Sequence, residues 1–404
     1  MQFFKDLSWS SFTAGFVSVL VGITSSIAII YQAAQAFGAT PAMLASWLWA
    51  ICIGMGLATA VPSLWLRKPV MVAWSTPGAA VLASAGLVGG FSMGDAVGAF
   101  MASAVLVVLM GATGWFERVM NRIPVALASA LLAGVLARFG LAGFAAAQSA
   151  LPLVVLMLLT YLLGKRFVPR YAVPGTLLFA VLFVAAQGGF SRVDIPLGLT
   201  VPVFVAPEFS FSALVSLALP LFVVTMASQN LPGVAAIRAS GFGDERAQGG
   251  DAGIPVSKIL TLTGLVTLVL APFGAFSINL SAITAAICMG PEAHPDRTRR
   301  YTAAVSCGVM YIVLGLFGAT IMALLTAFPT ELVAAIAGLA LMGTIGSALA
   351  AALHNEADRE AAMVTFLITL SGVVIGGVGS AFWGLVAGVL ALAVQHYRPA
   401  KRQA

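Results

Sequence analysis

Two short segments of the chain combine the residue types that could bind an anion inside a membrane. The first is Ser75–Gly78 (STPG) and the second is Ser277–Asn279 (SIN), and each leads into an apolar helical run. A serine or threonine hydroxyl caps free amides at a helix start, and proline suits the first helical turn. We expect Ser277 and Asn279 to cap the second helix in the same way. A helix that begins mid-membrane leaves about four N–H groups unpaired and carries roughly half a positive charge, so it attracts an anion.

Two neighbouring amides form a third candidate. Gln229 and Asn230 lie deep in an apolar segment that continues into Pro232 and Gly233. Side-chain amides in a membrane hydrogen-bond either a ligand or a neighbouring helix. We favour ligand contact, because their span is expected to pack beside both broken segments. Ser25 lies in the corresponding stretch of the first span, where close helix packing and ligand contact are equally good interpretations.

The acidic residues are informative by where they are missing. All 14 Asp and Glu lie in connections or at span ends, so no obvious proton carrier is expected at the membrane midplane. Glu331 is a candidate for proton coupling, although its position at the start of the twelfth span favours an acid that stabilises the first turn of that helix.

The string Gly241–Asp244 (GFGD) matches intramembrane aspartyl proteases, but no second intramembrane aspartate accompanies it. With no hydrolase, metal or nucleotide motif either, the sequence predicts no enzyme, no cofactor and no metal site.

The elements that must position these residues are membrane spans. The chain has 404 residues, of which 60% are hydrophobic and only 8% are charged. A water-soluble globule is excluded, since soluble domains carry roughly 25% charged residues. At ~20 residues per span with short connections, the chain holds about fourteen spans and no sizeable soluble domain.

The N-terminus has no cleavage site and is expected to start the mature protein. The three cysteines lie in apolar stretches without CxxC spacing, which predicts neither a disulfide framework nor a zinc site.

The cations indicate topology. The net charge is +6, but the cations lie in short runs between apolar segments, so we expect no nucleic acid partner. With the N-terminus inside, alternate connections hold all but two of the 20 Lys and Arg, the exceptions being Arg138 and Arg192. Both termini are therefore predicted to be cytoplasmic. Arg138 is expected to extend its side chain to the outer surface.

The order of the spans predicts two halves. We assign spans 1–7 to residues 1–188, an outer connection to 189–210, and spans 8–14 to 211–404. Because seven is odd, the second half starts from the opposite side and could be an inverted copy of the first. The third and tenth spans are both interrupted by a short extended stretch and a half-helix. Either one alone could be a structural helix kinked by proline, but two in matching positions favour a shared binding site.

Four strings of residues resemble those of the bacterial benzoate:proton symporters, carriers related in fold to uracil and sulfate permeases. These strings lie at 17–35, 74–79, 228–233 and 276–287. The resemblance implies an all-α membrane protein with a seven-plus-seven inverted repeat. It also implies a core domain of spans 1–4 and 8–11, a gate domain of spans 5–7 and 12–14, and often a homodimer. Where nucleobase permeases carry a glutamate in the eighth span, this chain has Gln229, which disfavours a nucleobase.

We therefore predict a secondary transporter of the bacterial inner membrane that imports benzoate or a similar aromatic carboxylate, with a proton. Substrate would lie between the third, eighth and tenth spans, and the core would move against the gate. The residues expected to bind it are Ser75, Thr76, Pro77, Gly78, Gln229, Asn230, Ser277, Ile278, Asn279 and Leu280, with Ser25, Trp74, Phe276 and Ser281 as further candidates. The alternative is a carrier or channel for a small inorganic anion such as sulfate or bicarbonate.

Overall fold

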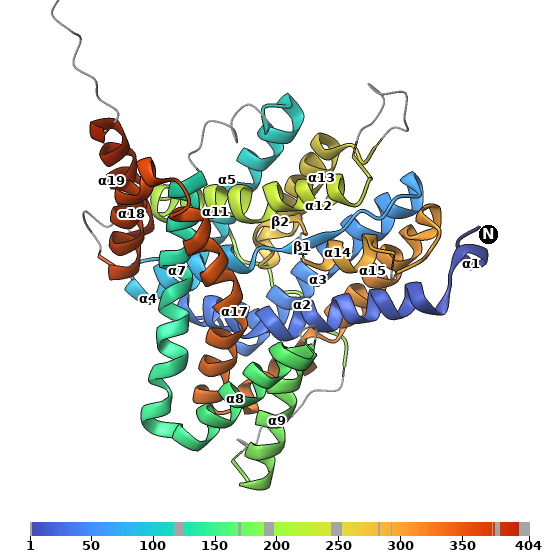
Figure 1. Ribbon diagram of the computed structural model, residues 1–404, viewed down its shortest axis with the longest axis horizontal. Coiled ribbons are helices and arrows are strands. Elements are labelled where there is room, and N and C mark those ends of the chain that lie inside the picture. The colour runs from blue at the N-terminus through green and yellow to red at the C-terminus, as the bar shows by residue number, and fades with distance from the viewer. Residues whose placement is uncertain are drawn as a thin grey trace, which may run out of the picture.

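The chain folds into a bundle of helices around one short two-stranded sheet (Figure 1). The computed structural model describes residues 2–116, 125–168, 171–189, 198–243, 253–281, 283–291, 293–373, 375 and 380–395. The side chain of Ser25 and the residues Asp244 and Arg192 lie outside the described part.

The helices follow the apolar segments of the sequence. In chain order they are α1 (Gln2–Asp6), α2 (Trp9–Ala36), α3 (Pro41–Leu66), α4 (Thr76–Val88), α5 (Met93–Thr113), α7 (Val125–Ala145), α8 (Ala147–Phe167), α9 (Ala172–Ala186), α10 (Phe211–Ala213), α11 (Leu219–Thr225), α12 (Leu231–Ala239), α13 (Val256–Leu270), α14 (Ile283–Met289), α15 (Tyr301–Leu316), α16 (Gly318–Ala327), α17 (Thr330–Ala352), α18 (Arg359–Ser371) and α19 (Ser380–Gln395). Two π-helical segments, η2 (Leu214–Ala218) and η3 (Met226–Asn230), join α10, α11 and α12 into one continuous span. Three short 3₁₀ segments, η5 (Ala271–Phe273), η6 (Arg297–Arg299) and η7 (Glu356–Asp358), complete the helical elements of the described residues.

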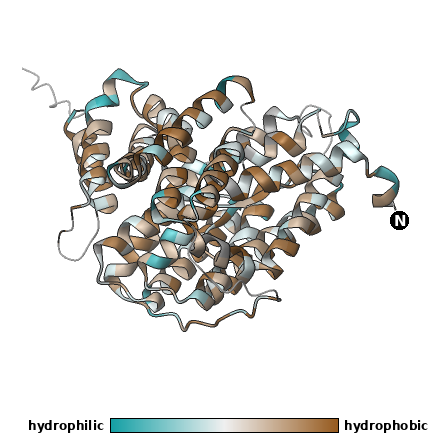
Figure 2. Ribbon diagram, turned by 90° about the horizontal axis from the view of Figure 1, so that it is seen from below, coloured by the Kyte–Doolittle hydropathy of each residue, from teal (hydrophilic) through white to brown (hydrophobic). Residues whose placement is uncertain are grey.

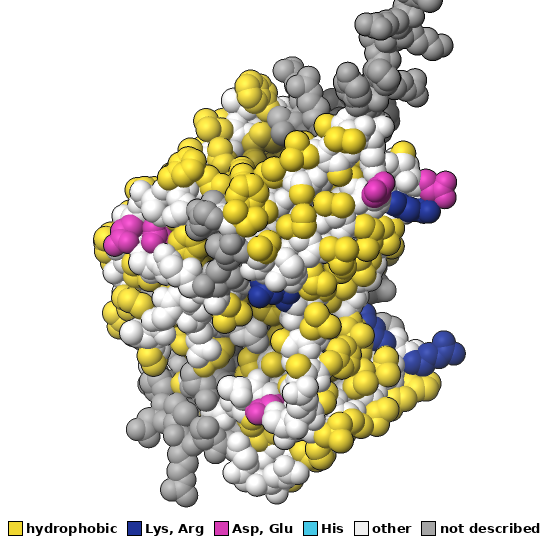
Figure 3. Space-filling model, turned by 90° about the vertical axis from the view of Figure 1, so that its left-hand side faces the viewer, with side chains coloured by type: hydrophobic (Ala, Val, Ile, Leu, Met, Phe, Trp, Pro, Cys, Tyr) yellow, Lys and Arg dark blue, Asp and Glu magenta, His cyan; other side chains and the backbone are white. Residues whose placement is uncertain are grey.

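The structure confirms a mostly helical membrane protein. Within the described residues, seven helices are long and apolar enough to cross a bilayer, and α2, which bends by 40° between Ile23 and Ser26, adds an eighth. Hydrophobic residues make up much of the helix bundle in the ribbon (Figure 2). Many of these side chains are exposed, and Trp65, for example, is 84% exposed. One side of the molecule shows few charged groups among mostly apolar side chains (Figure 3). Such a surface suits hydrocarbon, which needs no hydrogen bonds. The count of fourteen spans and the inverted repeat stay predictions.

Both broken spans have the predicted extended stretch and half-helix. Strand β1 (Val72–Trp74) precedes α4, and strand β2 (Ile278–Leu280) precedes α14. The two strands pair antiparallel at the centre of the bundle (Figure 1), with Ala73 opposite Asn279.

The predicted cap of the second half-helix is wrong. Helix α14 begins only at Ile283, so Ser277 and Asn279 lie before its start and do not cap it. Residues 278–280 form the strand instead, because their backbone groups pair with β1. Ser277 takes a left-handed conformation, with φ of 41°, directly before the strand.

The helices pack in two sets. In one set α3 packs against α15, α5 against α13, and α2 against α4 and α15; in the other α7 packs against α17 and α18, α18 against α19, and α8 against α9. The second set lies at the left and bottom of Figure 1, while the sheet lies within the first. The assignment of spans to core and gate domains stays a prediction.

Candidate functional site

The two strands bring the broken spans into direct contact. Beyond the paired residues, the Ser75 N–H donates to the Ser277 carbonyl (3.1 Å) and the Ser281 N–H donates to the Met71 carbonyl (3.0 Å). The hydroxyl of Ser75 caps α4 by accepting from the Gly78 N–H (2.9 Å), as the Ser-Thr-Pro-Gly string predicts. The start of α4 is therefore fixed directly beside β2.

One hydroxyl of the eighth span joins both broken spans. Thr225 Oγ1 lies 2.6 Å from Ser277 Oγ and donates to Ser75 Oγ at 3.0 Å. All three side chains are buried. A sliding movement of the eighth span would leave these buried hydroxyls without hydrogen-bond partners, which costs free energy. The network therefore holds the eighth span in register with the strands.

The π-helical turn η3 directs the two amides to different places. Asn230 is fully buried, and its Oδ1 accepts from the Leu280 N–H (3.0 Å), so it ties the turn to β2. Gln229 is half-buried and lines a cavity instead. A π-helical turn often marks a functional site, because it changes the direction of successive side chains within a span.

The cavity has a volume of about 60 Å³. The residues that line it come from α2, β1, α4, η3, the tenth span and α15: Val21, Gly22, Ser26, Ala73, Trp74, Thr76, Gln229, Ser281, Thr284 and Tyr311. Ser26 Oγ lies 2.7 Å from Thr76 Oγ1, so α2 and α4 meet at this wall. The Trp74 and Tyr311 rings pack edge to face, with centroids 6.0 Å apart. The cavity thus has a hydroxyl-rich side and an aromatic side.

Four of the predicted site residues line this cavity: Trp74, Thr76, Gln229 and Ser281. Of the others, Ser75, Ser277 and Asn230 belong to the hydrogen-bond network described above, and the Gly78 and Leu280 amides already donate within the protein. Pro77 lies in the first turn of α4, and Ile278 is buried opposite Trp74 in the sheet.

Two further predicted residues lie apart from the cavity lining. Phe276 packs against Trp47 and Phe100, with ring centroids 5.8 and 6.0 Å away. Asn279 is fully buried; its Nδ2 donates to the Ser277 carbonyl (2.8 Å), and its Oδ1 has no partner among the described residues.

The sequence analysis did not select several lining residues. Gly22, Thr284 and Tyr311 stand among apolar neighbours in their spans, and nothing in the local pattern marks them. Ser26 adjoins a stretch that close helix packing explains equally well. Only the meeting of five separate spans places the lining side chains around one space.

The described lining residues carry no charged group. Their side chains include four hydroxyls, from Ser26, Thr76, Ser281 and Thr284, together with the Gln229 amide and the Tyr311 phenol. Hydroxyl, amide and phenol groups all donate hydrogen bonds. The Thr76 N–H at the start of α4 has no acceptor among the described residues. The arrangement can therefore hold an anion through neutral donors and the positive end of a helix.

Glu331 lies in a different place from this cavity. It lines a separate cavity of about 260 Å³ with residues of α8 and α9, and its Oε1 accepts from the Ser149 hydroxyl (3.2 Å). The two cavities share no lining residue. Within the described part of the chain, no group of three or more His, Cys, Asp or Glu side chains could hold a metal ion.

Solved structures of known proteins share this fold. The transmembrane domain of the cyanobacterial bicarbonate transporter BicA aligns over 94% of this chain and 97% of its own, with a TM-score of 0.59 and 15% identity. The murine Slc26a9 anion transporter in the inward-facing state aligns over 96% of this chain and 68% of its own, with a TM-score of 0.53 and 12% identity. At such identities the likeness shows the fold alone.

Sequence relatives are closer. The chain is 47% identical over 375 residues to the inner membrane protein YdcO of Escherichia coli (strain K12), covering 93% of each chain. It is 38% identical over 388 residues to the benzoate membrane transport protein of Acinetobacter baylyi, covering 96% of this chain and 95% of the relative. The family model described as benzoate membrane transport protein matches residues 5–394. The chain therefore belongs to the benzoate membrane transport protein family.

Proposed function

We propose that this protein imports benzoate or a similar aromatic carboxylate across the bacterial inner membrane by secondary transport, with a proton. The observation that carries the proposal is the central cavity, which joins neutral hydrogen-bond donors on one side to the Trp74 and Tyr311 rings on the other. Membership of the benzoate transport family and the relative from Acinetobacter baylyi support the same substrate class.

The polar side of the cavity suits a carboxylate. A carboxylate only accepts hydrogen bonds, and the Thr76 hydroxyl, the Thr76 N–H and the Gln229 amide can all donate to it. Bonds to a charged acceptor are stronger than neutral ones. The described lining residues include no carboxylate that would repel the substrate.

The aromatic side suits the ring. Trp74 and Tyr311 already pack edge to face, a geometry that aromatic groups favour because the edge of one ring is positive and the face of the other is negative. A benzene ring between them would extend this arrangement.

The small volume supports a transport cycle with moving parts. At about 60 Å³ the cavity is well below the ~300–1,000 Å³ of typical small-molecule sites. An aromatic substrate therefore requires that the lining elements separate. The expected core domain, spans 1–4 and 8–11, would move against the expected gate domain, spans 5–7 and 12–14. This movement would open the site to one side of the membrane at a time, as in transporters built from repeats.

The proton would travel with the substrate. No carboxylate lies among the described lining residues, and Glu331 lines a separate cavity. Benzoic acid can carry its own proton, so transport needs no relay in the protein. We further propose that both termini are cytoplasmic and that the protein forms a homodimer.

A second candidate substrate is a small inorganic anion such as bicarbonate or sulfate. The specific observation in its favour is the cavity volume, which fits a compact anion without separation of the walls. Such an anion would make no use of the aromatic side.

The test is uptake of labelled benzoate into proteoliposomes with an imposed inward proton gradient. Empty liposomes run in parallel, because benzoic acid crosses lipid by itself. We expect saturable, protein-dependent accumulation that collapses with the gradient. Uptake equal to that of empty liposomes, with the protein shown to be folded, would overturn the proposal. Excess sulfate or bicarbonate should leave benzoate uptake unchanged, whereas strong competition would favour the inorganic anion.

Two variants test the site itself. Thr76→Val and Gln229→Leu each remove a donor from the cavity and should lower uptake about tenfold or more, the equivalent of one lost charge-assisted hydrogen bond. Thr113→Val is the matched control, because the Thr113 hydroxyl is exposed and donates only to the Leu109 carbonyl of its own helix.

A further inference from the structure

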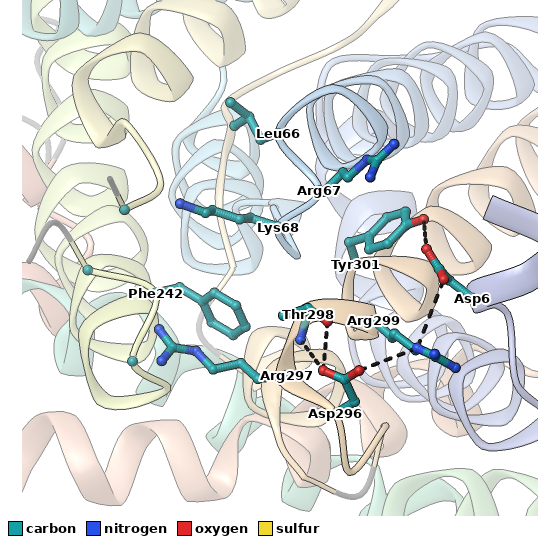
Figure 4. Close-up of a pocket in the computed structure, with 13 residues that line it drawn as sticks. Asp6, Leu66, Arg67, Lys68, Phe242, Asp296, Arg297, Thr298, Arg299 and Tyr301 are labelled. Carbon is teal, nitrogen blue, oxygen red and sulfur yellow. Dashed lines mark hydrogen bonds and ion pairs between the residues drawn. The ribbon is translucent and has the colours of Figure 1, made fainter. Parts of the chain in front are cut away.

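A second, larger cavity lies at the end of the molecule where α1 is found. Its volume is about 560 Å³, and it shares no lining residue with the transport cavity. The lining comes from the ends of α1 and α3, the segment after α12, and the turn before α15: Asp6, Leu66, Arg67, Lys68, Gly241, Phe242, Gly243, Gly253, Asp296, Arg297, Thr298, Arg299 and Tyr301. Figure 4 draws these residues and labels ten of them, which come from separate elements.

The two carboxylates of this cavity are already bound. Asp296 accepts from the N–H and the hydroxyl of Thr298 (2.9 and 2.7 Å), which lowers the pKa of its carboxyl and keeps it ionised. Arg299 Nε lies 3.3 Å from Asp296 and 3.9 Å from Asp6. Asp6 also accepts from the Tyr301 hydroxyl (2.8 Å). Dashed lines in Figure 4 join these groups on one wall.

Three cations are left over. Among the described residues, no carboxylate lies within ion-pair distance of Arg67, Lys68 or Arg297. In Figure 4, Lys68 and Arg297 extend from different elements, with Phe242 between them in this view. The described lining residues carry four cationic side chains and two carboxylates, a surplus of two positive charges.

The Arg297 guanidinium is held by packing, and it donates no hydrogen bond to another residue of the described part. Its guanidinium carbon lies 4.7 Å from the centre of the Phe242 ring, a cation–π contact. Gly241, with φ of 76°, leaves the space that a side chain would take, because a Cβ there would lie 3.0 Å from the guanidinium carbon. A guanidinium fixed by packing presents its donors to a ligand at little entropic cost.

We propose that this cavity binds a phosphate-bearing anion. Arginine matches phosphate with a planar fork of N–H donors, and lysine adds a point charge. The source would be either the headgroup of an anionic phospholipid or a soluble phosphate compound. Basic pockets between membrane helices on the cytoplasmic side suit phospholipid headgroups, and this end of the molecule is the one predicted to face the cytoplasm.

The bound anion would link elements that also form the transport cavity. Arg67 and Lys68 follow α3 and lead into β1, which carries Trp74. The segment with Phe242 follows η3 and α12, and Arg297 precedes α15. An anion that bridges these cations holds the ends of three such elements together, so its binding raises the stability of the folded protein.

The competing explanation is that these cations only set topology, as Lys165 and Arg166 can. Both of those lie exposed in the last turn of α8, outside the cavity. The double variant Lys165→Gln/Arg166→Gln is therefore a matched control for the loss of cytoplasmic charge. The test variants are Arg297→Gln alone, which leaves Arg67 and Lys68 to orient the chain, and the triple variant Arg67→Gln/Lys68→Gln/Arg297→Gln.

The experiment measures binding to the purified full chain in two arms. The first titrates inorganic phosphate at constant ionic strength, with chloride as reference, and follows the thermal unfolding midpoint by tryptophan fluorescence. The second uses native mass spectrometry to count lipids retained from mixtures of phosphatidylglycerol and phosphatidylcholine. Neither readout depends on which substrate is transported, so failure here leaves the benzoate proposal intact.

We expect the wild-type protein and the control to be stabilised by phosphate or to retain phosphatidylglycerol selectively. Arg297→Gln should weaken the effect about tenfold or more, and the triple variant should abolish it. An effect in the first arm identifies soluble phosphate as the source, and an effect in the second alone identifies the lipid headgroup. The same response in the wild-type protein, the control and Arg297→Gln, or no response in any, would overturn the proposal. If the triple variant does not fold, Arg297→Gln decides the question.

Discussion

The guanidinium of Arg138 donates from Nη1 to the hydroxyl of Ser84 over 2.6 Å. Arg138 lies on α7, a helix of the expected gate, and Ser84 lies on α4, the half-helix of the third span. The guanidinium thus contacts a neighbouring helix, and its expected extension to the outer surface stays a prediction. The bond therefore joins two elements that the proposed cycle moves apart.

Breaking this bond should change the balance between transport states. A hydrogen bond from a charged donor contributes about 1.5–3 kcal/mol, so Arg138→Met should shift the equilibrium about 10- to 100-fold away from this arrangement. The check is a double-mutant cycle of thermal unfolding and uptake with Arg138→Met, Ser84→Ala and both. Additive effects would show that the two residues are not coupled. Arg359→Met, which removes an exposed ion pair with Glu356 (3.1 Å), should have little effect on either readout.

Filling the space at Gly22 should block the cavity. A Cβ at this position would overlap the hydroxyl of Tyr311, whereas the next ring atom, Cζ, is an ordinary 3.6 Å away. We expect Gly22→Ala to abolish benzoate uptake and the double variant Gly22→Ala/Tyr311→Phe to regain part of it. Gly346→Ala is the control, because nothing lies within 4 Å of its added Cβ. Equal uptake by Gly22→Ala and Gly346→Ala would contradict the cavity geometry.

Adjacent amides should behave differently when replaced. Asn230→Leu leaves the buried Leu280 N–H without its acceptor, so it should lower the free energy of unfolding by about 1–3 kcal/mol. Gln229→Leu removes a side chain that lines the cavity, so it should lower uptake with little change in stability. Chemical denaturation and proteoliposome uptake, measured on the same preparations, separate the two effects. If both variants lost stability and uptake to the same extent, the assignment of Asn230 to the structure and of Gln229 to the cavity would be wrong.

Asn279 should matter more for transport than for folding. Its Oδ1 is buried without a hydrogen-bond partner among the described residues, which costs desolvation free energy. A residue with a structural role alone would have this acceptor paired. Replacement by alanine removes this unpaired acceptor, so the free energy of unfolding should change little. Uptake should nevertheless fall strongly in Asn279→Ala. Normal uptake would refute a role of Asn279 in transport, and Asn355→Ala, in an exposed turn, serves as control.

The sequence by itself determined the kind of protein and the place of its irregular spans. Apolar composition dictates membrane helices, because hydrocarbon cannot satisfy free backbone groups. The Ser75–Gly78 string dictates a capped half-helix, and the structure has it with Gly78 bonded to Ser75. These are local properties, fixed by each residue and its near neighbours.

The tertiary structure decided which polar residues face the cavity. The tenth span looks locally like a helix start at Ser277, yet pairing with β1 turns residues 278–280 into a strand. That pairing, with the Thr225 network behind it, places Thr76 and Gln229 at the cavity and Asn230 in the network. Tyr311 reaches the same space from α15. Such contacts join segments far apart in the chain, and their register depends on the packing of the whole bundle, so no local pattern could reveal them.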